Sequence, residues 1–290
     1  MLKAYILLLL AITFFSGNFI VGKSVADTIP PFTLALCRAS LALFFVSLFG
    51  FRQWKRHLLL WKKEWKPLAG MALTGIVGFT ALVYLSLHYT TTINASIVEA
   101  STPIVVALFS IIFLKEKLQR HQYVGIILSF IGVLWVVTEG SIQRLLSLSL
   151  NTGDFIMVLA VFSWAIYSLL VKEHSWKFPL YGSLLSMLFI AVLVLFPLAL
   201  TEAQQWSSIN WSTPVLLQLL YLGIFPSVLA LTSWNKAVEI IGPSKASTFL
   251  NLIPVFTSIG AVLLLNETFL FVQLYGGLLV IIGVFITTRR

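Results

Sequence analysis

Charged residues are scarce in this chain of 290 residues. They make up 10% of the sequence, whereas hydrophobic residues make up 59%, and the mean hydropathy is +0.99. Polar stretches between the apolar runs rarely exceed about fifteen residues, which leaves no room for a separate water-soluble core. Because this composition lies far outside the range of soluble globular proteins, it predicts an all-α polytopic membrane protein.

Cysteine and metal-binding patterns are equally scarce. The single cysteine, Cys37, lies inside an apolar run, which excludes a disulfide framework. The four histidines are scattered without the spacing of a zinc site, and the chain lacks the G-x4-G-K-[ST] loop of nucleotide hydrolases. No nucleophile is paired with a base as an intramembrane enzyme requires. We therefore expect no catalytic activity, no metal and no cofactor.

Acidic residues are outnumbered by basic ones, with 10 Asp and Glu against 19 Lys and Arg. The basic residues lie in short loops between apolar runs and form no stripe typical of a nucleic-acid-binding surface. The expected partners are therefore the lipid bilayer and a small-molecule substrate. The oligomeric state is not determined by the sequence.

Ten apolar segments follow one another along the chain, and most reach the ~20 residues that cross a hydrocarbon core. The first continues through Asn18 and Lys23 without a small-x-small cleavage pattern, so it is interpreted as an uncleaved helix. The ten segments are 4–22, 32–51, 67–88, 95–114, 122–138, 153–171, 179–200, 213–233, 246–265 and 270–288.

The basic residues fall on alternate loops. With both termini placed in the cytoplasm of a cell or inner membrane, the outer loops hold only Lys23 and Arg144. The excess of basic residues on the inner side predicts this orientation and favours ten segments over nine. The fifteen inner residues are Lys3, Arg52, Lys55, Arg56, Lys62, Lys63, Lys66, Lys115, Lys117, Arg120, Lys172, Lys177, Lys236, Arg289 and Arg290.

The chain matches itself at an offset of 151 residues. Five helices per copy is an odd number, so the second copy runs through the membrane in the opposite direction, as in alternating-access carriers. We predict a first five-helix repeat at 1–138, an external linker at 139–152 and a second repeat at 153–290. The matched residues are Pro103 and Pro254, Glu116 and Glu267, Gly125 and Gly276, and Gly132 and Gly283.

The paired P-x12-E-x8-G-x6-G blocks, with Gly17, Asn18, Lys23 and Arg38 in the first two segments, resemble the EamA branch of the drug/metabolite transporter superfamily. The resemblance covers nearly the whole chain. It implies ten helices around a central cavity, lined mainly by helices 1, 3, 4, 6, 8 and 9, and the export of amino acids, other metabolites or drugs. The second repeat lacks a counterpart of Arg38, where Ser186 falls at a similar depth.

Glu99 is the acidic residue that lies well inside a predicted span. A carboxylate there is costly unless water, a cation or a partner offsets it, so a role in substrate binding or proton coupling is expected. The alternative is a structural ion pair with Arg38, which lies at comparable depth in the second segment. For Arg38 we favour the structural role.

Two prolines interrupt the helical hydrogen bonding of the fourth and ninth segments. Pro103 shares a face with Glu99, and Pro254 shares one with Asn251, by helical spacing. Each proline is assigned a structural kink, which serves either packing alone or a nearby site. Glu116 and Glu267 precede short turns, and we expect them to favour or cap the amino termini of the helices that follow.

Aromatic and amide side chains complete the predicted substrate site. Tyr84, Trp164 and Tyr167 carry rings with polar tips, which suit either stacking on a substrate or an interfacial belt. Asn18 is expected to face the cavity or to bond a neighbouring helix. The residues proposed from the sequence to bind substrate are Asn18, Tyr84, Glu99, Trp164, Tyr167 and Asn251.

These observations predict a secondary transporter that exports a small amino acid, aromatic or amphipathic metabolite by alternating access. The alternatives are a multidrug or cationic-compound efflux carrier, and a small-molecule channel or membrane scaffold. Substrate identity, direction and coupling ion are not determined by the sequence.

Overall fold

The computed structural model describes residues 1–26, 28–90, 95, 98–138, 140–146, 151–257, 259 and 271–289. Throughout these ranges the secondary structure is helical and contains no strand. The elements are α1 (Leu2–Ala26), α2 (Pro31–Arg56), α3 (Leu58–Lys63), α4 (Trp65–Met71), η1 (Ala72–Gly78), α5 (Phe79–Tyr89), α7 (Thr102–Phe113), α8 (Arg120–Val137), α9 (Ile142–Leu146), α10 (Thr152–His174), η2 (Ser175–Lys177), α11 (Leu180–Leu200), η3 (Ala203–Ser208), α12 (Thr213–Ile224), η4 (Phe225–Ala230), α13 (Leu231–Ile241), α14 (Pro243–Thr248), η5 (Phe249–Leu252) and α16 (Phe271–Thr288).

Seven helical stretches of the described residues are long and apolar enough to cross a membrane, and two shorter apolar helices accompany them. These nine correspond to nine of the ten segments expected from the sequence. The other segment, 246–265, begins in α14 and η5 and continues beyond the described residues. The nine are Leu2–Gly22, Pro31–Arg56, Trp65–Tyr89, Val98–Phe113, Arg120–Val137, Thr152–Lys177, Leu180–Leu200, Thr213–Ile241 and Leu274–Thr288.

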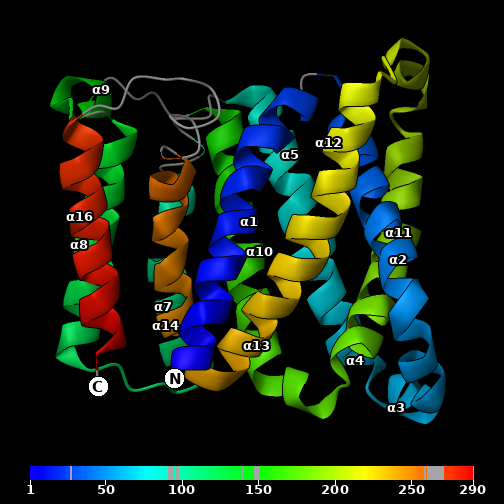
Figure 1. Ribbon diagram of the computed structural model, residues 1–290, viewed down its shortest axis with the longest axis horizontal. Coiled ribbons are helices and arrows are strands. Elements are labelled where there is room, and N and C mark those ends of the chain that lie inside the picture. Colours follow the sequence, from blue (N-terminus) through cyan, green and yellow to red (C-terminus); the bar gives the residue numbers. More distant parts are fainter. Residues whose placement is uncertain are drawn as a thin grey trace.

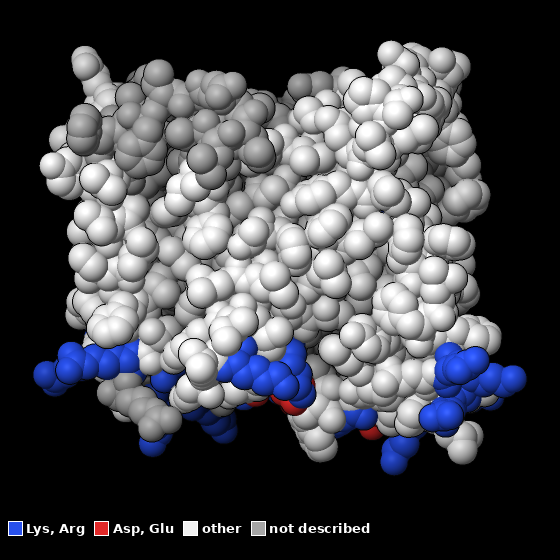
Figure 2. Space-filling model, in the orientation of Figure 1, with Lys and Arg blue, Asp and Glu red and all other residues white. Residues whose placement is uncertain are grey.

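The long helices stand side by side, with α8 and α16 at one end of the row and α2 and α11 at the other (Figure 1). Both chain termini lie at the same face. Lysine and arginine side chains gather along that face, and the described surface above them is uncharged on the side seen in Figure 2. An apolar surface above a basic rim is typical of a membrane-spanning protein, and the basic rim marks the expected cytoplasmic side.

Helices α8 and α16 approach closely because glycines face glycines. A Cβ atom added at Gly132 would lie 2.8 Å from the carbonyl oxygen of Gly276, and one added at Gly276 would lie 3.0 Å from that of Gly132. Gly125 and Gly283 meet in the same way, at 2.5 and 2.7 Å. The four glycines matched in the sequence therefore form two reciprocal contacts, as their expected role in close packing requires.

Helices α2 and α11 also pack against each other, and each bonds the amino terminus of the other. The carboxylate of Glu202, just after α11, accepts from the backbone N–H groups of Phe32 and Thr33 at 3.0 and 2.8 Å. The side-chain oxygen of Gln53, near the end of α2, accepts from the backbone N–H of Gly182 at 2.8 Å. Each bond satisfies a donor that the first turn of a helix leaves free.

The expectation for Glu116 needs a correction. Helix α8 is capped by Gln119, whose side chain and that of Gln122 bond each other's backbone N–H groups. Glu116 instead accepts from the hydroxyl of Ser244 at 2.7 Å and so connects the end of α7 to α14. It does not cap the following helix, because Gln119 occupies that position. Glu267 lies outside the described residues.

Candidate functional site

Two long helices are each interrupted by a short π-helical segment. The stretch from α4 to α5 contains the π-helical segment η1, and the stretch from α12 to α13 contains the π-helical segment η4. A π-helical turn leaves backbone carbonyls without their usual partners, and such turns are frequent at functional sites. Side chains supply the bonds here: Ser163 donates to the carbonyl of Thr74 at 2.8 Å, and Ser227 donates to that of Leu222 at 2.7 Å.

The fourth and ninth segments are also irregular, next to the two matched prolines. A turn at Ser101 separates the residues before it from α7, and Pro103 lies in the first turn of that helix. The 3-10 segment η5 immediately precedes Ile253 and Pro254. Both prolines mark breaks, as expected, although neither lines the cavity described next.

A cavity lies where these irregular segments converge. Its wall comes from α1, α2, η1, α5, Glu99 just before α7, the first residue of α7, α10, α11, η4, α13, η5 and Ile253 just after η5. The open space measures ≈ 50 Å³, which is room for a few water molecules. Arg38 of α2 and Leu188 of α11 belong to the wall, so two helices are added to the six that the resemblance implied.

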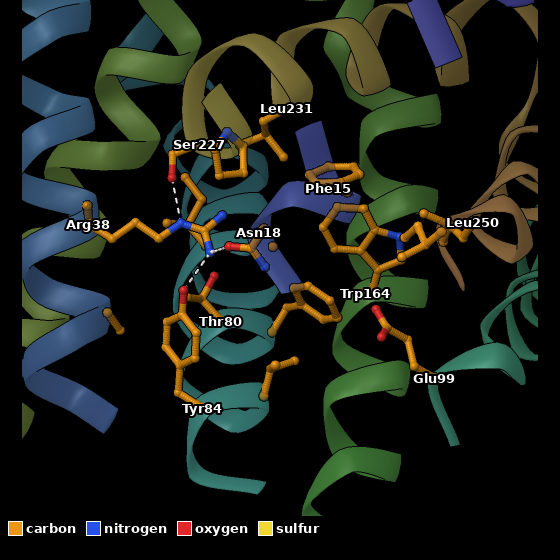
Figure 3. Close-up of a pocket in the computed structure, with 18 of the residues that line it drawn as sticks. Phe15, Asn18, Arg38, Thr80, Tyr84, Glu99, Trp164, Ser227, Leu231 and Leu250 are labelled. Atoms are coloured by element: carbon orange, nitrogen blue, oxygen red, sulfur yellow. Dashed lines mark hydrogen bonds between the residues drawn. The ribbon is translucent and has the colours of Figure 1, made fainter. Parts of the chain in front are cut away.

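Arg38 is the centre of a polar cluster in the wall (Figure 3). Its Nε donates to the hydroxyl of Ser227 at 2.6 Å, and its Nη1 donates to Asn18 Oδ1 and to the Tyr84 hydroxyl, both at 3.0 Å. The partners come from α1, α5 and η4, so the guanidinium joins four elements at one point. Asn18 therefore does what both interpretations expected, because it lines the cavity and bonds a neighbouring helix.

Glu99 also lines the cavity, but it does not pair with Arg38. Its backbone oxygen accepts from the Thr102 hydroxyl at 2.5 Å, and its carboxylate has no hydrogen bond or ion pair with any described residue. In Figure 3 the carboxylate lies apart from the guanidinium, near Trp164. The structural ion pair considered from the sequence is thus not formed in this conformation.

Trp164 is the aromatic centre of the wall. Its ring lies 4.6 Å from Phe79 and 5.8 Å from Phe15, measured between centroids, and all three residues line the cavity. The indole N–H of Trp164 is buried without a hydrogen-bond partner. The wall therefore offers an aromatic surface, suited to a flat or apolar ligand body.

Two of the six residues proposed to bind substrate do not reach the cavity. Tyr167 packs behind the wall, against Gly75, and donates a hydrogen bond to Asn235 Oδ1 at 2.5 Å. Asn251 is buried and donates to the hydroxyl of Ser129 at 2.8 Å. Asn18, Tyr84, Glu99 and Trp164 do line it. Helical spacing places a residue on a face, but it does not determine how far the neighbouring helix stands from that face.

Sequence reasoning missed Ser227. Its signal was its position directly after Pro226, since a proline within an apolar helix frees a carbonyl that a nearby hydroxyl can satisfy. Among the described residues no group of three His, Cys, Asp or Glu side chains is arranged to hold a metal ion.

The chain is similar over its length to known transporters. The profile of the EamA-like transporter family matches residues 2–138 and again residues 151–289. An uncharacterized transporter of Archaeoglobus fulgidus is 31% identical over 99% of this chain and 98% of its own length. A probable amino-acid metabolite efflux pump of Salmonella typhimurium is 28% identical over 97% of this chain and 93% of its own. A solved crystal structure shares the fold, with a TM-score of 0.81, 16% identity and coverage of 98% of this chain and 96% of that one.

Proposed function

We propose, since the chain belongs to the EamA-like transporter family, that this transporter exports a small metabolite across the cell membrane by alternating access. The observation that carries the proposal is the position of the cavity. Its wall contains residues of both stretches that match the family profile, and irregular helices of both stretches converge on it. Carriers bind substrate at such an interface between repeats, where broken helices meet.

Several contacts support two inverted five-helix repeats, at 1–138 and 153–290, joined by an external linker at 139–152. The offset of 151 residues relates Gly125 to Gly276 and Gly132 to Gly283, so it maps the contact between Gly132 and Gly276 onto the contact between Gly283 and Gly125. The bonds between α2 and α11 are also reciprocal, because Glu202 follows Gln53 by 149 residues and Gly182 follows Thr33 by 149. Reciprocal contacts of this kind are expected of two copies related by a twofold axis in the membrane plane. They favour ten membrane helices.

The π-helical segments provide a route for the change of access. Segments η1 and η4 both line the cavity, and each replaces regular helical bonds with side-chain bonds that are easily exchanged. Local rearrangement at these segments would let the cytoplasmic and external halves of the two long helices move separately. A static channel needs no such matched pair of irregular helices.

Two observations support a metabolite as the substrate and export as the direction. The Salmonella typhimurium relative is named as a probable amino-acid metabolite efflux pump. The aromatic surface around Trp164, next to charged groups on the same cavity wall, suits a compound with an apolar body and a polar end.

Counterflow in proteoliposomes tests the proposal. Vesicles containing the purified protein are loaded with one unlabelled amino acid at high concentration, and entry of the same labelled amino acid is followed for each member of a panel. A carrier accumulates label transiently above its external concentration, because outward movement of unlabelled substrate drives inward movement of labelled substrate. Simple equilibration without an overshoot for every compound that enters would establish the channel instead.

Cysteine labelling tests the orientation, with both termini in the cytoplasm. Lys55 and Gln204 are exposed at opposite ends of the α2–α11 pair, and neither makes a hydrogen bond that a substitution would remove. In a Cys37→Ala background, an impermeant thiol reagent added to intact cells is expected to label Gln204→Cys and to spare Lys55→Cys until the cells are opened. The reverse pattern would invert the proposed topology.

The rival function with support in the structure is efflux of cationic compounds, because the Glu99 carboxylate lines the cavity and has no partner among the described residues. The counterflow panel therefore also includes organic amines and quaternary ammonium compounds.

A further inference from the structure

In the polar cluster around Arg38, the donor and the acceptor of each hydrogen bond can be assigned. A guanidinium has five N–H donors and no acceptor, so each of its three neighbours must accept from it. The orientation of the Asn18 amide follows, since Oδ1 faces Nη1 at 3.0 Å and the NH2 group faces away from Arg38. Tyr84 likewise accepts from Arg38 through its oxygen, which leaves its own O–H free to donate.

Three donors remain unused after these bonds are counted. Arg38 has committed Nε and Nη1, so the two hydrogens of Nη2 are left over. Neither the Asn18 NH2 group nor the Tyr84 O–H has an acceptor among the described residues. All three residues line the cavity. This part of the wall therefore presents donors from three helices and a full positive charge.

No carboxylate of the described residues balances the charge of Arg38. Its three partners are neutral, and no described carboxylate forms an ion pair with it. An arginine within a membrane span normally pairs with an acid or faces water, because an isolated charge is costly there. Here a neutral cluster holds the guanidinium through Nε and Nη1, and Nη2 makes no hydrogen bond to a described residue. Such an arrangement is complementary to an anion, above all to a carboxylate, whose oxygens accept from a guanidinium at short distance.

We propose that Arg38, with Asn18 and Tyr84, forms the subsite that binds the carboxylate of the transported compound. This inference rests on the proposed function and specifies its substrate class: organic acids and amino acids with an apolar or aromatic body. The body lies against Phe15, Phe79 and Trp164, which share the cavity with the donors.

Matched ligands test the carboxylate and the ammonium group of an amino acid one at a time. The apparent melting temperature of the purified protein in detergent is measured with phenylalanine, 3-phenylpropanoate and phenethylamine, and with the corresponding leucine and tryptophan series. A ligand that binds the folded state raises this temperature. We expect at least one series in which the amino acid and the deaminated acid raise it and the amine does not. Shifts with amines alone, or with no carboxylate compound, would overturn the inference.

An isosteric variant tests the subsite directly. In Asn18→Asp the new carboxylate replaces an oxygen that already accepts from Arg38, so it neutralises the guanidinium without changing the shape of the wall. The ligand-free protein is expected to melt no lower than the wild type, while affinity for carboxylate ligands falls tenfold to a hundredfold, the usual worth of a charge-assisted hydrogen bond. Asn235→Asp is the matched control, because Asn235 does not line the cavity.

Arg38→Lys and Arg38→Gln complete the series. Lysine keeps the charge without the planar fork, so we expect it to retain part of the affinity that glutamine loses. Unchanged carboxylate binding in both Asn18→Asp and Arg38→Gln would refute the subsite. Counterflow on the same preparations distinguishes failure of this inference from failure of the proposed function. Exchange of amines but not of acids would refute the carboxylate subsite and would still agree with the proposed transport function. Binding of ligands without any exchange would refute the proposed transport function alone. A shift with chloride that carboxylates do not increase would identify an inorganic anion site instead and overturn the inference.

Discussion

The two stretches that match the family profile contribute unequally to the cavity. The first supplies the groups with strong polarity and charge, and the second supplies a mostly apolar surface in which the hydroxyl of Ser227 is the polar side chain that bonds Arg38. From the first come Asn18, Arg38, Thr80, Tyr84, Glu99 and Thr102, among others; from the second come Trp164, Leu188, Pro226, Ser227, Leu231, Leu250 and Ile253.

The features that shape and pack the helices, by contrast, occur in both stretches. Each has a π-helical segment at the cavity, a break beside its matched proline, a pair of packing glycines and a side chain that bonds the other's helix terminus. We infer from this comparison that packing and the proposed movement depend on features that both halves share, whereas the proposed recognition of substrate depends on charged groups that the first half carries. The predictions below test each side of this contrast.

The largest effect is expected at Glu99. Its carboxylate is inside a membrane span, lines the cavity and has no protein partner among the described residues, so we propose that it carries the proton that is coupled to transport. Glu99→Gln mimics the protonated form permanently. In proteoliposomes this variant should keep exchange of labelled for unlabelled substrate, which moves no net proton, and lose uphill accumulation driven by an imposed pH gradient.

The control for this experiment is Glu173→Gln, which makes the same chemical change at an exposed position outside the cavity. It should transport as the wild type does. If Glu99→Gln abolishes exchange as well, the carboxylate binds the substrate itself. Normal uphill transport and normal affinity in Glu99→Gln would remove this residue from the mechanism and weaken the contrast between the halves.

The next effect concerns the contact between α8 and α16. A Cβ atom at Gly276 would lie 2.6 Å from Cγ2 of Val136 and 3.0 Å from the backbone oxygen of Gly132, so the helices must separate to accept Gly276→Ala. We expect the free energy of unfolding to fall by about 1–3 kcal/mol, as for other overpacked sites. Denaturation in a mixed-micelle titration measures the loss.

Gly277→Ala provides the control one residue away. The nearest atoms to a Cβ there are the methyl carbons of Val255 at 3.5 and 3.7 Å, which is ordinary contact. Gly132→Ala should match Gly276→Ala, because the two glycines face each other. A large difference between those two variants would contradict the assignment of the loss to this shared contact.

Much of the fold could be predicted from the sequence, because apolar runs of membrane length and basic loops are local signals. Nine of the expected spans correspond to described apolar helices. The matched glycines were found from a shared offset, and they do pack together. Glu116 was misplaced because capping was inferred from chain proximity, whereas its partner Ser244 lies 128 residues away.

The site was predicted less completely, because cavity walls depend on how helices are spaced. Asn18, Tyr84, Glu99 and Trp164 were recovered as polar or amphipathic side chains inside spans. Tyr167 has the same chemistry and lies one turn from Trp164, but Gly75 lets the neighbouring helix cover it. The partners of Arg38 come from three separate elements, and no pattern within one helix indicates that they meet.

Removing the reciprocal bonds between α2 and α11 is expected to lower the free energy of unfolding, and by different amounts for the two bonds. Glu202 accepts three hydrogen bonds at the amino terminus of α2, from two backbone N–H groups and the Thr33 hydroxyl, and its charge favours the helix dipole. Glu202→Ala should therefore lower the free energy of unfolding by about 2 kcal/mol, the upper end for a lost cap. Gln53→Ala removes one neutral bond and should cost about 1 kcal/mol. Equal losses, measured by the same titration, would contradict the charge argument.

The smallest effect on stability is expected at Tyr167, a residue of the second half whose ring does not line the cavity. Its hydroxyl donates to Asn235 behind the wall, so Tyr167→Phe removes a structural hydrogen bond and should lower the free energy of unfolding by about 1 kcal/mol. Ligand affinity in the melting-temperature assay should not change, because the ring face that packs on Gly75 is kept. Tyr84→Phe is the informative partner variant: it removes a hydroxyl that lines the cavity and accepts from Arg38, and it should weaken carboxylate binding. If Tyr167→Phe weakens binding as much as Tyr84→Phe does, the second half contributes a polar group to recognition, and the division between a charged half and an apolar half fails.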